Sequence, residues 1–180
     1  LFSCLNSLCV SAESEKIHID VLILPKFEEG ELYGDFPGEA QFYYEAYLMD
    51  GDTYEISGGN KLYVRDGIAL FITEMGKVNA ALSTMSVLID ERFDFSDAYI
   101  ISTGCAGSAI EYGVMGDVFI ITAAIDYDLG HHADSREMLD PSTATWFRDT
   151  DNDDAAFLLL DPELMDRVYD LVKDVKIETT

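Results

Sequence analysis

The feature that most constrains the fold is a change of hydrophobic period between two apolar runs near the middle of the chain. Residues 68–73, IALFIT, and residues 98–102, AYIIS, have the composition of buried strands. Between them the sequence from Val78 to Glu91 predicts a helix, whose buried face would hold the apolar residues at helical spacing, Ala81, Met85, Leu88 and Ile89. A strand, a helix and a second strand in this order are typical of parallel strands in an α/β fold.

Other segments add to this sheet. We expect residues 17–24, IHIDVLIL, to form the first strand, and residues 118–125, VFIITAAI, to form a strand covered on both faces. Gly58-Gly59-Asn60 lies between DTYEIS and KLYV, and Asp66-Gly67 marks a further turn, so an antiparallel hairpin joins the parallel strands.

Two helices are expected outside the central unit. Residues 39–48, EAQFYYEAYL, predict a short helix with an aromatic face. Asp161-Pro162-Glu163 is a typical helix start, because Asp caps the first turn and Pro fits the first helical position. The apolar stripe of this last helix would consist of Leu164, Val168, Leu171, Val172 and Val175.

The charge balance excludes some partners. The chain has 180 residues, with 35 acidic against 11 basic side chains and a net charge of −24. Such a chain repels phosphate backbones and anionic lipid, so we expect neither nucleic acid nor a membrane surface as a partner. The sequence contains no run of eighteen apolar residues, so it predicts no membrane-spanning helix.

The first residues differ in composition from the rest. Residues 1–12, LFSCLNSLCVSA, end in small residues and resemble the tail of a secretory signal peptide, which predicts an exported protein. We expect residues 13–180 to form a single α/β domain. In that domain Cys105 has no second cysteine as a disulfide partner and lies in no zinc-ligand spacing.

The most informative loop follows the strand at residues 98–102. Thr103-Gly104-Cys105-Ala106-Gly107 carry almost no side-chain bulk, and ligands of open α/β sheets lie beyond the carboxyl ends of the strands. The sequence therefore predicts a loop where a ligand approaches the main chain, although glycines that only make tight turns remain the alternative.

Three other patterns favour structural roles. His131-His132 with Asp128 and Asp134 lacks helical metal-ligand spacing, so we predict no metal site there. The acidic stretch 149–154 lacks the glycine and the closing glutamate of a calcium loop. Cys105 has no identifiable base partner, and we expect a small buried residue, while core packing is the expected role of Trp146 and Phe147.

Several motifs in series resemble a known superfamily. EMGKVNAA, ISTGCAG and GDVFIITAAIDYDLG follow the order and spacing of the nucleoside phosphorylase and nucleosidase superfamily. LPKFEEGE, GEAQFYY, GHHAD and TWFRDTD resemble one branch of it, the purine nucleoside permease family. The resemblance implies a phosphorylase-like three-layer α/β sandwich with a mixed, partly parallel sheet, which recognises a purine nucleoside.

The resemblance also assigns site residues. The implied substrate-binding positions are Phe27, Glu28, Gly76, Thr103, Gly104, Cys105, Ala106, Gly107 and Asp128. The superfamily's ribose-holding Met-Glu motif and its acid near the purine lie beyond the last residue, so we expect a fold truncated on the C-terminal side and assign no catalytic residue. The loops offer Lys26 and Lys77 but no arginine, which argues against tight phosphate binding.

Three functions remain open at this point. The first is purine nucleoside recognition linked to uptake, which would need a membrane transport partner. The second is an enzyme that cleaves the N-glycosidic bond, a phosphorylase or nucleosidase, with phosphate as co-substrate only for a phosphorylase and no other cofactor. The third is a protein that only packs or oligomerises around a vestigial cleft, and a homo-oligomer is compatible with all three.

Overall fold

The computed structural model describes residues 15–140, 142, 145–147 and 157–176. The chain divides into two compact units, with the boundary between Gly107 and Ser108. The division into two compact units does not show that either unit folds alone. The single domain expected over residues 13–180 therefore stays a prediction. The leader-like residues 1–12 and the acidic stretch 149–154 lie outside the described residues.

The first unit is built on a mixed five-stranded sheet with the order β3-β4-β5-β2-β7. Its strands are β2 (Val21–Leu24), β3 (Asp52–Glu55), β4 (Lys61–Arg65), β5 (Ile68–Phe71) and β7 (Tyr99–Ser102). β2 pairs in parallel with both β5 and β7, whereas β3, β4 and β5 form antiparallel pairs. Positive φ angles of 50° at Asp66 and 78° at Gly67 make the tight turn between β4 and β5. The predicted α/β class, with a hairpin beside parallel strands, is confirmed.

Helix α2 (Lys77–Leu88) joins β5 to β7, as the sequence predicts, but its buried face differs from the prediction. Val87 is fully buried, whereas the side chains of Met85 and Ile89 are 56% and 66% exposed. Val87 shares its helix face with Ser83 and Thr84, which are half-buried. Leu88, a residue of the predicted stripe, is half-buried and packs against the same cluster as Val87, so the prediction is right for Leu88 and wrong for Ala81, Met85 and Ile89.

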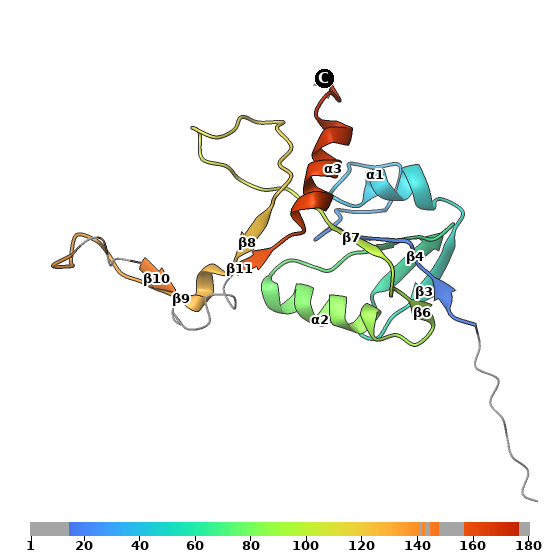
Figure 1. Cartoon of the computed structure of the whole chain (residues 1–180). Coiled ribbons are helices and arrows are strands. Elements are labelled where there is room, and N and C mark those ends of the chain that lie inside the picture. Colours follow the sequence, from blue (N-terminus) through green and yellow to red (C-terminus); the bar gives the residue numbers. More distant parts are fainter. Residues whose placement is uncertain (1–14, 141, 143–144, 148–156, 177–180) are drawn as a thin grey trace, which may run out of the picture. The chain divides into compact units, whose positions relative to one another are not determined.

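The sheet of the first unit buries residues on both faces. Leu22 and Leu24 of β2 share a cluster with Val87 of α2, whereas Ile23 shares the other cluster with Leu48. Leu48 ends a π-helical turn, η1 (Tyr44–Leu48), which continues the short helix α1 (Gln41–Tyr43). α1 and α2 therefore cover opposite faces of the sheet (Figure 1). This arrangement follows from the alternation of side chains along β2.

β7 was predicted as a buried strand, and the strand is confirmed while its burial is wrong. Tyr99, Ile100 and Ile101 are 54%, 53% and 46% exposed. The reason is position, because β7 is the last strand in the order of the sheet and pairs with β2 on one side. A run of apolar residues predicts that a strand is covered by another part of the protein, but it does not indicate which segment covers it.

The predicted first strand at residues 17–24 is divided in two. β1 (Ile17–His18) pairs in parallel with β6 (Phe93–Asp94) in a small separate sheet. The division falls at Asp20, whose amide donates to the Gly67 carbonyl at 2.8 Å instead of continuing the β6 ladder.

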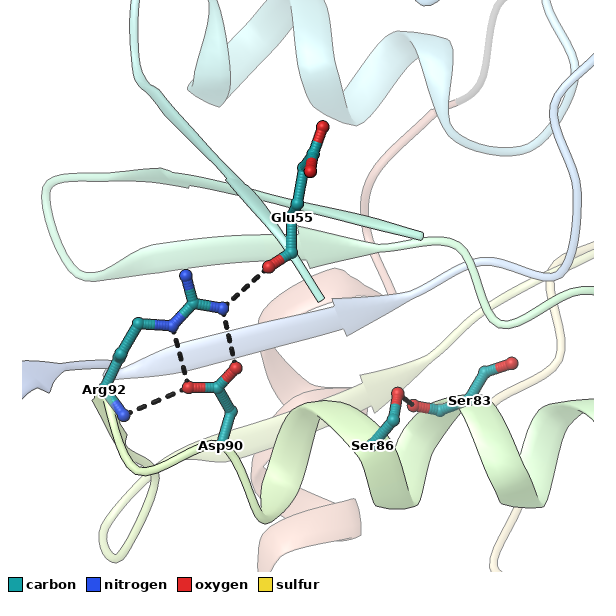
Figure 2. A network of polar contacts seen from close by, with 5 residues as sticks. All are labelled: Glu55, Ser83, Ser86, Asp90 and Arg92. Carbon is teal, nitrogen blue, oxygen red and sulfur yellow. Dashed lines mark hydrogen bonds and ion pairs between the residues drawn. The ribbon is translucent and has the colours of Figure 1, made fainter. Parts of the chain in front are cut away.

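An arginine ties this corner of the first unit together. The guanidinium of Arg92 donates to both carboxylate oxygens of Asp90, at 2.9 and 2.7 Å, and to the Glu55 carbonyl at 2.7 Å (Figure 2). Asp90 follows α2 and Glu55 ends β3, so one side chain links the helix end to the hairpin. These hydrogen bonds from Arg92 lower the pKa of Asp90.

In its described residues, the second unit contains two short antiparallel pairs, a 3-10 turn and one α-helix. β8 (Ala123–Ile125) pairs with β11 (Phe157–Leu159), and β9 (Gly130–His132) pairs with β10 (Thr145–Phe147). The predicted strand 118–125 is therefore wrong in extent, and Val118 and Ile121 are exposed. Residues 123–125 form a strand because β11 pairs with them through hydrogen bonds. An apolar sequence does not by itself provide such a pairing partner.

The last helix, α3 (Pro162–Val172), begins as predicted. The Asp161 carboxylate accepts a hydrogen bond from the Leu164 amide at 2.8 Å. Its predicted apolar stripe is only partly covered, with Leu164 half-buried and Leu171 80% exposed. Among the described residues, no helix has both the length and the apolar character that crossing a membrane requires.

Candidate functional site

The carboxyl ends of β2, β5 and β7 meet at one edge of the sheet, because the three strands are parallel. The Thr73 amide, after β5, donates to the Pro25 carbonyl at 3.0 Å, and the Thr103 amide, after β7, donates to the Leu24 carbonyl at 3.3 Å. This edge is the usual ligand position in an open α/β sheet. Eight of the nine predicted substrate-binding residues lie in the loops that leave it: Phe27, Glu28, Gly76, Thr103, Gly104, Cys105, Ala106 and Gly107.

The ninth residue, Asp128, belongs to the second unit. It lies in the 3-10 turn η2 (Tyr127–Leu129), and its amide donates to the Asp126 carboxylate at 3.1 Å. The structure therefore gives no geometric relation between Asp128 and the strand-end loops. A hollow of about 620 Å³ in the same unit is lined by residues 115–120 and by Tyr169, Val172, Lys173 and Val175 of the C-terminal segment, and includes no predicted site residue.

Glu39 is the residue that organises the strand-end loops. Its carboxylate accepts the Cys105 amide at 2.7 Å and the Lys26 amide at 2.9 Å. The loops after β7 and β2 are thereby joined by one side chain located just before α1. A Cβ atom on Gly104 would lie 2.9 to 3.1 Å from this carboxylate, so a larger residue there would make the Glu39 side chain shift.

Cys105 is therefore engaged through its amide and not through its thiol. The side chain is exposed and unpaired with another cysteine, so the prediction of a small buried residue is wrong. The physical reason is that the loop runs along the surface of the first unit after the edge strand β7, where residues 104–107 are all exposed.

Polar side chains hold the rest of this loop. The hydroxyls of Tyr43 and Thr103 lie 3.0 Å apart, which connects α1 to the end of β7. The ammonium group of Lys26 donates to the Leu24 carbonyl at 2.8 Å and to the Ser102 hydroxyl at 2.7 Å. Burial lowers the pKa of Lys26, and the charge of Glu39 acts in the opposite direction.

Glu28, a predicted site residue, has its carboxylate occupied by main-chain donors. It accepts the amides of Ala40 and Gln41 at 2.8 and 2.6 Å, and also the amide of Gly38. This carboxylate closes the long loop between β2 and α1 onto itself. Glu28 therefore shapes the loop in this structure, and its role in binding a substrate stays a prediction.

Gly76 begins α2 with a φ angle of 91°, a conformation that favours glycine strongly. A Cβ atom there would meet no atom within 4 Å. Glycine is therefore favoured at this position by the backbone conformation and not by a close contact with another residue.

A hollow of about 420 Å³ lies beside the loop that follows β2. Its lining includes Tyr33, Tyr44 and Tyr63 together with Glu28 and Ile72. The rings of Tyr44 and Tyr63 meet edge to face at 5.3 Å, and burial, followed by the proximity of Tyr44 and Glu31, raises the pKa of Tyr63. Aromatic walls with a few polar groups suit a flat, uncharged ligand.

Sequence reasoning missed Glu39 and Tyr43 as site residues. Both lie in GEAQFYY, a segment that contributed to the family resemblance without a role for each residue. The contact of Glu39 with Cys105 spans 66 positions of the chain. The available signal was an acid directly before a short helix, which by itself indicates only a helix start.

The histidine segment shows local contacts. A ring nitrogen of His132 lies 2.7 Å from the Tyr127 carbonyl, and the two rings stack at 3.9 Å. Asp134 forms an ion pair with Arg136, and hydrogen bonds from Arg136 lower its pKa. The contacts of His132 are therefore made within its own segment.

Comparison with known proteins places the chain in a family. The family model described as purine nucleoside permease (NUP) matches residues 18–180. A probable purine nucleoside permease of Schizosaccharomyces pombe is 31% identical over 105 residues, which are 53% of this chain and 30% of that relative. No solved structure matches the chain. From the family model, which covers nearly all of the chain, we conclude that this protein belongs to the purine nucleoside permease family.

Proposed function

We propose that this chain recognises a purine nucleoside at the carboxyl ends of β2, β5 and β7, as the ligand-binding part of a nucleoside uptake system. The observation that carries the proposal is the meeting of the three strand-end loops at one edge of the sheet, in a member of the purine nucleoside permease family. The loop at residues 103–107 offers backbone and small side chains, and the nearby hollow offers tyrosine rings beside the side chains of Glu28 and Glu31.

The proposal extends to features that the family alone does not fix. A phosphorylase-like fold is the architecture we propose, supported by the mixed sheet with helices on both faces. Export of the protein, a membrane transport partner and a homo-oligomer complete the proposal. A transport partner is included because the family is described as a permease.

The test is direct binding by calorimetry. Inosine and adenosine are titrated into the protein, and the mixtures are then analysed by chromatography for free hypoxanthine and adenine. Heat of binding without released base supports recognition. Release of base would instead indicate an enzyme, phosphorolytic if it needs phosphate and hydrolytic if it does not. Absence of binding heat for every purine nucleoside would contradict the proposal.

A variant locates the site. Gly104→Val should abolish nucleoside binding, because the added Cβ would lie 2.9 Å from the Glu39 carboxylate. The larger side chain would also occupy the space in which a ligand approaches the main chain of this loop. Thr53→Val, on the outermost strand β3 and exposed, is the control for a valine introduced at the surface away from these loops. Circular dichroism checks that both variants fold. Unchanged affinity in a folded Gly104→Val protein would remove this loop from the site.

A further inference from the structure

The Glu39 carboxylate places a negative charge between the ends of β2 and β7. Two backbone amides, of Lys26 after β2 and of Cys105 after β7, converge on the Glu39 carboxylate at 2.9 and 2.7 Å. Converging main-chain N–H groups at strand and loop ends are a common way for proteins to hold phosphate or another anion. Here the chain supplies the anion itself.

The ammonium group of Lys26, whose backbone amide binds Glu39, is itself hydrogen-bonded. The Lys26 ammonium donates to the Leu24 carbonyl and to the Ser102 hydroxyl, at 2.8 and 2.7 Å. The charge of Glu39 acts on this ammonium group. A phosphate entering this corner would therefore meet a carboxylate on the amides and a lysine already bonded to oxygen atoms.

The surroundings add to the repulsion. Glu28, Glu29 and Glu31 follow β2 in the neighbouring loop, and the whole chain carries a net charge of −24. A dianion close to a half-buried carboxylate is strongly disfavoured, because water screens the charges poorly there. An uncharged ligand pays no such cost and can use the exposed loop at residues 103–107.

We propose that Glu39 is a specificity-determining residue, whose carboxylate fills the anion position between β2 and β7 so that the site accepts uncharged nucleosides and rejects nucleoside phosphates and inorganic phosphate. This inference rests on the proposed function for its ligand class. It also gives a physical reason for recognition without phosphorolysis, because the co-substrate of that reaction is a phosphate dianion.

The experiment compares inosine, inosine 5′-monophosphate and inorganic phosphate by calorimetry on the full chain. The wild type should bind inosine and bind the monophosphate at least about tenfold more weakly, a difference of about 1.4 kcal/mol. Glu39→Ala removes both the charge and the side-chain atoms that occupy the two amides, so it should gain about tenfold or more in affinity for inorganic phosphate and for the monophosphate. Glu55→Ala, with an exposed side chain on β3, makes the same change elsewhere and should leave phosphate affinity unchanged.

A second variant separates charge from loop support. Glu39→Asp keeps the charge and shortens the reach, so it should still reject phosphate even if the loop is loosened. The inference is overturned if wild type binds inosine and its monophosphate equally, or if folded Glu39→Ala rejects phosphate as wild type does. Absence of inosine binding would contradict the proposed function alone, since the gain of phosphate affinity in Glu39→Ala is measured independently of nucleoside.

Discussion

The loop between β2 and α1 depends on one carboxylate, and Glu28→Gln tests that dependence. One carboxylate oxygen of Glu28 accepts the amides of Ala40 and Gln41, and the other accepts those of Glu29 and Gly38. Glutamine keeps one acceptor oxygen and replaces the other with an NH₂ group, which is itself a donor. Two main-chain N–H groups would then face a donor instead of an acceptor.

The expected loss follows from those hydrogen bonds. A hydrogen bond to a charged group contributes about 1.5–3 kcal/mol. Glu28 is half-buried, so water can reach part of the exposed amides and reduce the loss. We expect the free energy of unfolding to fall by about 2 kcal/mol, which lowers the melting temperature by about 4–8 °C in a chain of this size.

Thermal unfolding followed by circular dichroism measures this effect. Glu29→Gln is the matched control, since the neighbouring side chain is exposed and the substitution removes the same charge. A Glu28→Gln protein that melts within about 1 °C of the Glu29→Gln protein would refute the reasoning, because the clamp would then contribute nothing measurable.

Three further predictions concern stability. Leu22→Ala, at a fully buried position of β2, should cost about 2–5 kcal/mol in urea unfolding, while Leu82→Ala, at a position 66% exposed, should cost less than about 0.5 kcal/mol. Asp161→Ala removes the cap of α3 and should cost about 1 kcal/mol, seen as reduced helical signal, and an unchanged signal would contradict the capping role. Arg92 lowers the pKa of Asp90 below 3.8, so this pair stabilises the fold above that pH and the contribution is lost as the pH falls through the lowered value. Asp90→Asn should therefore show a smaller loss of stability than wild type in acid unfolding, and an equal loss would argue against the pair.

Much of the fold of the first unit is predictable from local patterns. The hairpin follows from Gly58-Gly59-Asn60, and the turn at Asp66-Gly67 needs the positive φ angles that these residues tolerate. α2 follows from its helical period, although its buried face does not. Leu88 of the predicted stripe packs on the core beside the fully buried Val87, whereas Met85 and Ile89 are exposed, because the spacing of apolar residues does not define which side of a helix meets the sheet.

The candidate site is predictable in place but not in detail. Small residues after β7 mark the loop, because bare main chain at a strand end is visible in sequence. The partner of that main chain is not visible, since Glu39 lies 66 positions from Cys105 and Tyr43 lies 60 positions from Thr103. Such pairs meet only when β2 is placed beside β7.

The sequence by itself determined the elements whose signals act over a few residues: the β4–β5 turn, the hairpin, the Asp161 cap and the strand–helix–strand order. Only the tertiary structure decided that β2 lies between β5 and β7, and that a carboxylate before α1 closes the gap between the two parallel strand ends. The physical reason is range, because turns and caps are satisfied within one stretch of backbone. The position of the Glu39 carboxylate at the strand ends depends instead on distant segments, which the sheet brings within hydrogen-bonding distance of each other.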